Sequence, residues 1–318
     1  MPELPEVETV ARGLQAALPG RRILNVRLSK TDFIANPAEI ERCLPGSRVS
    51  RVRRYGKFLV LDLDSSTATS QSPALLIHLG MTGRLILCRP EAPVAPHTHV
   101  FFALDDGREL RYTDIRRFGS MQFLPRGVNG SGLEKLGVDP LEVSELAFLS
   151  RLRGRRARIK ALLLDQGVLR GIGNIYADEI LWRARIHPMC LAANLKQDEL
   201  LCLHRAMRDV LNEAIRLRGS SISDYVDAEG LPGTFQLRHR VYGREGKKCF
   251  SCGTPIRRAV VAGRSSYFCP RCQPALRAPA RSRGKSRELS APPKNQNRPK
   301  QHEHDGVPKP GGRAHARP

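Results

Sequence analysis

The chain has 318 residues, of which 41% are hydrophobic, so it is long enough for two domains with apolar cores. An excess of 53 Lys and Arg over 31 Asp and Glu gives a net charge of +22, which favours a nucleic-acid partner over an acidic protein or a membrane surface. No segment approaches the roughly 18–20 apolar residues of a membrane span, and the first residues lack the basic and apolar pattern of a signal peptide. We therefore expect a monomeric cytoplasmic protein that associates with the nucleoid.

The first part of the chain is predicted to be one helix followed by antiparallel strands. Residues 2–18 carry apolar side chains at helical spacing, with Pro5 in the first turn and Pro19-Gly20 at the end. Short runs with β character follow at 23–28, 58–63, 75–79, 84–87, 100–104, 109–112 and 121–124. A hairpin turn is indicated at 105–107 (Asp-Asp-Gly). Strands this closely spaced favour a sandwich or a flattened barrel.

The second part is predicted to be helical, with a cysteine-bearing module behind it. Helical patterns cover 141–153, 158–165, 175–182 and 198–217. The fold class is therefore α+β, with a β-sandwich domain over 2–125, a helical domain over 126–241 and a cysteine module over 242–273. The segment 274–318 is rich in Pro, Gly and basic residues and poor in large apolar ones, so we expect a disordered basic tail.

Four cysteines have the spacing of a metal site. Cys249 and Cys252 form one C-x2-C pair, and Cys269 and Cys272 form a second pair after 16 intervening residues. Four thiolates complete a closed tetrahedral site without a position for water, so the expected cofactor is one structural zinc ion per chain. Disulfides are the alternative, which the absence of an export signal disfavours.

The N-terminal segment offers a nucleophile. After removal of the initiator methionine, Pro2 would present a secondary amine that titrates near pH 8, against about 10.4 for lysine. Such an amine forms an iminium directly with an aldehyde-level carbon. Glu3 and Glu6 are acid/base candidates beside it, although acidic residues in a first helical turn are also common for dipole reasons alone.

Several blocks of the sequence carry a resemblance. In chain order they are 2–9 (PELPEVET), 54–57 (RYGK), 77–83 (IHLGMTG), 111–119 (RYTDIRRFG), 171–177 (GIGNIYA), 186–188 (IHP) and the four-cysteine finger. They resemble the blocks of the bacterial formamidopyrimidine-DNA glycosylases, also called 8-oxoguanine DNA glycosylases, over residues 2–272. The related endonuclease VIII group typically has Gly where this chain has Leu4, which favours the purine-specific branch.

The resemblance implies a catalytic set and a reaction. Pro2 would attack C1′ of the damaged nucleotide, and Glu3 would donate a proton to the opening sugar. Lys57 matches the lysine that assists β-elimination and contacts phosphate, and Arg264 matches the arginine associated with the second elimination. The implied enzyme is a bifunctional glycosylase and abasic-site lyase that excises oxidised purines (8-oxoguanine, formamidopyrimidines) from duplex DNA by β,δ-elimination.

The resemblance also implies contacts with DNA. Backbone contacts fall on His78, His97, Arg116, Arg156, Lys160 and Asn174. Met81, Arg116 and Phe118 would fill the gap left by the flipped base, with Arg116 against the orphaned cytosine. From the residues alone, Met81 and Phe118 could instead be core residues, Arg156 part of a solvated basic face, and His97 with His99 half of a metal site.

Four further segments are compared with the family. Residues 219–243 resemble the family's flexible loop over the extruded base. Residues 171–177 match part of the family's helix–two-turn–helix element. An insertion-like stretch over 64–72 and the basic tail depart from the family pattern. Alternative functions are an endonuclease VIII-like glycosylase for oxidised pyrimidines and a non-catalytic DNA-binding zinc protein.

Overall fold

The N-terminal helix forms as its pattern predicts. The computed structural model describes residues 2–64, 72–125, 132–222 and 224–275, and α1 covers Leu4–Ala17. Pro5 lies in its first turn, where the missing N–H is not needed, and the Glu3 N–H donates to Glu6 Oε2 at 2.8 Å. The helix buries Val10 and Leu14 among its apolar side chains.

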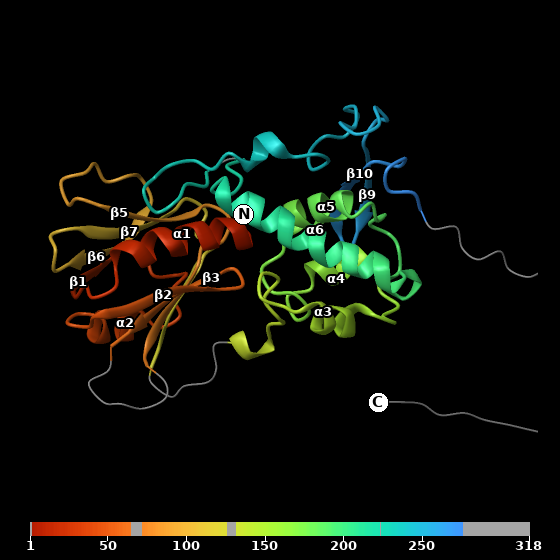
Figure 1. Cartoon of the computed structure of the whole chain (residues 1–318). Coiled ribbons are helices and arrows are strands. Elements are labelled where there is room, and N and C mark those ends of the chain that lie inside the picture. Colours follow the sequence, from red (N-terminus) through yellow and green to blue (C-terminus); the bar gives the residue numbers. More distant parts are fainter. Residues whose placement is uncertain (1, 65–71, 126–131, 223, 276–318) are drawn as a thin grey trace, which may run out of the picture. The chain divides into compact units, whose positions relative to one another are not determined.

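Two four-stranded antiparallel sheets form the predicted sandwich. One has the order β1-β6-β7-β5 and the other β2-β3-β4-β8. The strands are β1 (Ile23–Leu28), β2 (Val49–Tyr55), β3 (Phe58–Leu63), β4 (Ala74–His78), β5 (Gly83–Cys88), β6 (Thr98–Leu104), β7 (Glu109–Asp114) and β8 (Ser120–Leu124). Side chains from both sheets and from α1 share one apolar core, so the helix lies along the sandwich (Figure 1).

Two elements of this domain do not appear in the sequence prediction. Helix α2 (Pro37–Cys43) is short and buries only Ile40. Strand β2 contains three arginines and one tyrosine among its seven residues and buries Val49 and Val52 only. A strand with so few apolar side chains has little period-2 signal, although it pairs along its whole length with β3.

The helical part packs around a second core. Its helices are η1 (Leu133–Lys135), α3 (Glu145–Leu152), α4 (Ile159–Leu164), α5 (Asn174–Arg183), η2 (Ala192–Asn194), α6 (Gln197–Arg216) and η3 (Phe235–Arg238). The segment from α4 through two turns to α5 forms the expected helix–two-turn–helix element. None of the described helices is both long and apolar enough to cross a membrane.

Helix α1 belongs to both cores. Leu4 is buried in the helical core, whereas Val7, three residues later, is buried in the sandwich core. Figure 1 shows the N-terminal end of α1 directed toward α5 and α6. The first turn of the chain therefore lies where the two cores meet.

The cysteine module contains a β-hairpin. Strands β9 (Arg257–Val261) and β10 (Arg264–Phe268) pair antiparallel, and Gly263 adopts φ +71° at the tip. This hairpin packs against α5. The tail expected over 274–318 and the insertion expected over 64–72 lie almost wholly outside the described residues.

Candidate functional site

Glu3 lies at the N-terminal end of α5, about 170 residues away in sequence. Its carboxylate accepts the Gly173 N–H at 2.9 Å and the Ile175 N–H at 3.0 Å. A Cβ on Gly173 would lie 2.2 Å from Glu3 Cδ, so only glycine leaves room for the carboxylate. Burial raises the pKa of Glu3, which favours a protonated acid, against the opposing charge of Lys57. Pro2, beside it, is buried as well.

Glu6 joins the start of α1 to the segment after α6. It is 1% exposed and accepts the Ser220 N–H at 2.7 Å, the Glu3 N–H and the Tyr176 hydroxyl. Burial, reinforced by the Glu3 charge, raises the pKa of Glu6 to about 7. Tyr176 and Ser220 were not predicted as site residues. The local sequence offers no signal for them, because their partner is far away in the chain.

Lys57 occupies the tight turn between β2 and β3. Gly56 before it adopts φ +63°, and a Cβ there would lie 3.2 Å from Arg170 Cβ. Burial lowers the pKa of Lys57, and so does the charge of Arg264, whereas Glu3 and Glu6 oppose the shift. A lowered pKa makes the free amine more accessible, which suits a group that takes up a proton.

His78 lies beside this lysine. Its ring is 4.9 Å from that of Phe58, and its Nδ1 accepts the Gly80 N–H at 3.0 Å. Burial and the charge of Lys57 lower the pKa of His78, so its neutral form is favoured.

Arg264 opens β10, and its side chain is exposed. The next residue is held from the helical side: the Ser265 carbonyl accepts Lys160 Nζ at 2.9 Å and Asn174 Nδ2 at 3.0 Å. Lys160 also forms a fully buried ion pair with Asp178 at 2.8 Å. The predicted contacts of Lys160 and Asn174 with DNA stay predictions, and in this structure both side chains position the hairpin that carries Arg264.

The predicted gap-filling side chains point outward from two adjoining loops. Met81 is 39% and Phe118 57% exposed, so neither is the core residue that its type alone suggests. The Arg116 guanidinium lies 4.5 Å from the Phe118 ring centre. A Cβ on Gly80 would lie 2.4 Å from the backbone at Phe118 and Gly119, so the two loops touch directly.

The remaining predicted DNA contacts are more scattered. Arg156 is exposed in the basic segment between α3 and α4, and His97 is exposed at φ +64°. His99 is buried, and its Nε2 bonds to the Asp114 carbonyl at 3.1 Å. Among the described residues, no His, Asp or Glu group comes together with His97 and His99 as a metal site would require.

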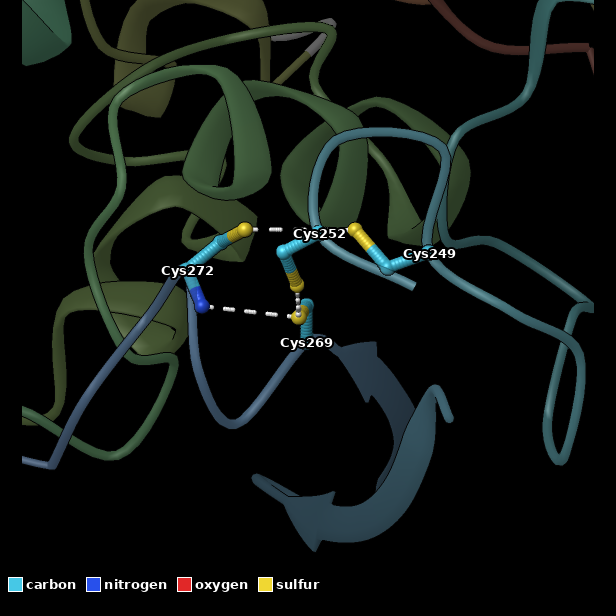
Figure 2. Close-up of side chains that lie close together, drawn as sticks. All are labelled: Cys249, Cys252, Cys269 and Cys272. Carbon is cyan, nitrogen blue, oxygen red and sulfur yellow. Dashed lines mark hydrogen bonds between the residues drawn. The ribbon is translucent and has the colours of Figure 1, made fainter. Parts of the chain in front are cut away.

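The four cysteines meet in space as their spacing predicts (Figure 2). The Sγ atoms of Cys249, Cys252, Cys269 and Cys272 lie within 4.8 Å of one another. Two cross pairs, one from each C-x2-C knuckle, are 3.9 Å and 3.4 Å apart. Sulfurs at about 2.3 Å from a tetrahedral zinc ion would show separations of this size, so the cluster fits one structural zinc ion.

Three family models match successive parts of the chain. The model of the formamidopyrimidine-DNA glycosylase N-terminal domain matches residues 1–121, and that of the glycosylase H2TH domain matches 136–226. A zinc finger found in FPG and IleRS matches 246–275.

Individual relatives agree. A formamidopyrimidine-DNA glycosylase of Pelotomaculum thermopropionicum is 46% identical over 86% of this chain and 99% of its own length. The MutM (FPG) structure from Thermus thermophilus is 41% identical, with a TM-score of 0.74 over 86% of this chain and 98% of the other. A Lactococcus lactis FPG structure with DNA containing Fapy-dG is 33% identical, with a TM-score of 0.76 over 86% of this chain and all of the other. Given this coverage by family models and relatives, the chain belongs to the formamidopyrimidine-DNA glycosylase family.

Proposed function

We propose that the protein is a bifunctional DNA glycosylase and abasic-site lyase of base-excision repair that removes oxidised purines from duplex DNA. One observation supports it above all others. Glu3 and Glu6, at the start of α1, lie close to Lys57 and next to Pro2. Membership of the family supports the substrate class, since related structures hold DNA with Fapy-dG or 8-oxo-G. The protein acts as a monomer on damaged duplex DNA and is associated with the nucleoid.

The first chemical step uses the N-terminal amine. The lone pair of the Pro2 nitrogen attacks C1′ of the flipped nucleotide, and the bond from C1′ to the base breaks. The base leaves with the bonding electrons and takes up the proton that the Pro2 nitrogen loses. Glu3 gives its proton to the ring oxygen O4′ as the sugar opens, which leaves an iminium between Pro2 and C1′. The raised pKa of Glu3 favours the protonated form that this step needs.

The second stage cleaves the strand. The iminium acidifies the C2′ proton, and its removal expels the 3′ phosphate; a further proton loss then expels the 5′ phosphate. Lys57 is placed to assist the first elimination, because its lowered pKa makes an unprotonated amine accessible. Arg264 neutralises the charge of a phosphate from the exposed start of β10.

Binding requires the base to leave the helix. Met81, Arg116 and Phe118 would enter the vacated space, with Arg116 against the orphaned cytosine, at an unstacking cost of a few kcal/mol. His78, His97, Arg156 and Asn174 would hold the backbone, whereas Lys160, which is fully buried, would act through the hairpin. The zinc ion would fix the hairpin on which Arg264 stands.

Borohydride trapping tests the proposal. The protein, freed of Met1 and shown to contain zinc, is incubated with duplex DNA that carries one 8-oxoguanine opposite cytosine. We expect a covalent adduct on the damaged strand that maps to Pro2, together with strand cleavage, and neither on undamaged duplex. No adduct and no cleavage would refute the proposal.

Two controls sharpen the test. Glu3→Gln removes the acid and keeps one of the two oxygens that accept the Gly173 and Ile175 amides, so we expect loss of base release with the protein still folded. A duplex with an oxidised pyrimidine measures the alternative specificity: faster trapping there than on 8-oxoguanine would move the protein to the endonuclease VIII-like function.

A further inference from the structure

A buried carboxylate lies beneath the two loops that carry the predicted gap-filling side chains. Asp114, the last residue of β7, has no exposed surface and is not among the predicted site residues. It accepts four donors: Thr82 Oγ1 at 2.5 Å, the Gly119 N–H at 2.9 Å, the Tyr112 hydroxyl at 3.1 Å and the Arg116 N–H at 3.3 Å. Three of these donors belong to the loops and only one to the strand.

The hydrogen bonds to Asp114 lie next to the gap-filling side chains. Thr82 directly follows Met81, and the amides of Arg116 and Gly119 lie on either side of Phe118. The Arg116 N–H also reaches Thr82 Oγ1 at 3.1 Å, which joins the two loops to each other. A single carboxylate therefore sets how the side chains of one loop stand relative to those of the other.

The apolar side chains at the tips of the two loops are not anchored by full burial. Met81 and Phe118 are exposed apolar side chains, and water favours their collapse onto the surface rather than their projection. Hydrogen bonds to a charged acceptor are stronger than those between neutral groups, and they gain further strength in a buried site. Four such bonds also satisfy the buried carboxylate, whose desolvation would otherwise destabilise the fold.

We propose that Asp114 is a positioning residue that holds the Met81 loop and the Arg116–Phe118 loop in one fixed arrangement before DNA is bound. This inference rests on the proposed function, because it concerns the step in which the gap in the duplex is filled. Preformed loops lose less conformational freedom on binding, so the gap is filled at lower cost and the opposite base is read in a fixed geometry.

The test compares a substrate that has a gap with one that does not. In Asp114→Asn an amide N–H2 replaces one acceptor oxygen and faces the N–H and O–H donors. We expect single-turnover excision of 8-oxoguanine from duplex DNA to fall at least tenfold, and the preference for cytosine over adenine opposite the lesion to shrink. Cleavage of an abasic site in single-stranded DNA should stay within twofold of the wild type, because no partner strand leaves a gap.

Companion variants separate positioning from folding. Thr82→Val removes the donor to Asp114 and the link to Arg116, so it should reproduce the duplex-selective loss even where Asp114→Asn fails to fold. Val26→Ala removes buried apolar volume from the same core without changing the hydrogen bonds to Asp114. Any decrease in rate that it causes should be the same on the duplex and on the single-stranded substrate.

Each result decides the matter. Normal duplex excision and normal opposite-base preference in Asp114→Asn and Thr82→Val would overturn the inference, and so would an equal loss on both substrates that Val26→Ala shares. A wild-type protein that traps no adduct would instead remove the proposed function, which the parallel wild-type reaction reveals independently of any variant.

Discussion

Lys160→Met separates two roles for a lysine that the sequence assigns to DNA. The ammonium is fully buried, pairs with Asp178 at 2.8 Å, and donates to the Ser265 carbonyl and to Ser266 Oγ. Removing one partner of such a pair leaves an uncompensated buried charge, which costs about 3–5 kcal/mol. We therefore expect the free energy of unfolding, measured by denaturant titration of the zinc-loaded protein, to fall by an amount of that order.

The loss should depend on pH in a defined direction. Burial raises the pKa of Asp178 to about 7 although Lys160 opposes the shift, so without Lys160 the pKa rises further. A raised folded-state pKa gives a contribution to stability that is present below the unfolded pKa and is lost as pH rises through the folded one. The free energy of unfolding of the variant should therefore fall less at pH 6, where Asp178 is protonated, than at pH 8.

The DNA-binding assay completes the argument. If Lys160 contacts a phosphate, its removal should reduce the slope of log affinity against log salt concentration by about one. A lysine that positions the hairpin leaves that slope unchanged while the strand cleavage assigned to Arg264 slows. Lys160→Met combined with Asp178→Leu should regain stability, since an apolar pair often replaces a buried ion pair without loss. Unchanged stability together with a reduced salt slope in Lys160→Met would refute the positioning role.

Three further predictions test other parts of the site. Cys252→Ala should lose bound zinc and weaken binding to damaged duplex, because the hairpin depends on the metal, and full damage-specific binding without zinc would contradict this. Gly173→Ala should slow excision about a hundredfold, because its Cβ would lie 2.2 Å from Glu3 Cδ. Gly167→Ala, whose Cβ would have its nearest atom at 3.3 Å, should excise at the wild-type rate. Equal excision rates for the two variants would contradict this prediction. Glu6→Gln should gain stability relative to the wild type as pH rises from 4.5 to about 7, by roughly 3 kcal/mol, because the folded state holds the Glu6 proton to higher pH; unfolding at pH 5 and 8 measures it, and a pH-independent difference would exclude it.

The sequence predicts local structure well where periodicity is strong and poorly where charge hides it. The first helix and most of the strands that contain short apolar runs form close to their expected ranges, for example β1 at Ile23–Leu28. Strand β2 was missed because three of its seven residues are arginines and only Val49 and Val52 are buried apolar side chains, and its pairing with β3 depends on the tertiary structure. The zinc cluster was predictable since each C-x2-C pair is local, and only the meeting of the two pairs needs the fold.

The site itself was predictable only in part. Glu3, Glu6 and Lys57 were named from the sequence, but the hydrogen-bond partners of Glu6 were not. Tyr176 and Ser220 bond to Glu6 across 170 and 214 positions of sequence, and no local pattern encodes such a distance. Lysine side chains are ordinarily exposed, so the residue type of Lys160 predicts a position on the surface. Its burial is possible because Asp178 pairs with it.

Glu3, the proposed catalytic acid, also has a structural role that links the two cores. Helix α5 begins directly after Gly173, which has no side chain to cap the free backbone N–H groups of the first turn. Glu3 provides that cap from the other end of the chain, through Gly173 and Ile175. The acid is thus placed by bonds that the helix itself requires, and Leu4, packed in the helical core, prevents the first turn of α1 from moving away. Because docking of the two cores and placement of the acid depend on the same contacts, a chain in which the cores separate loses the cap and the catalytic geometry together.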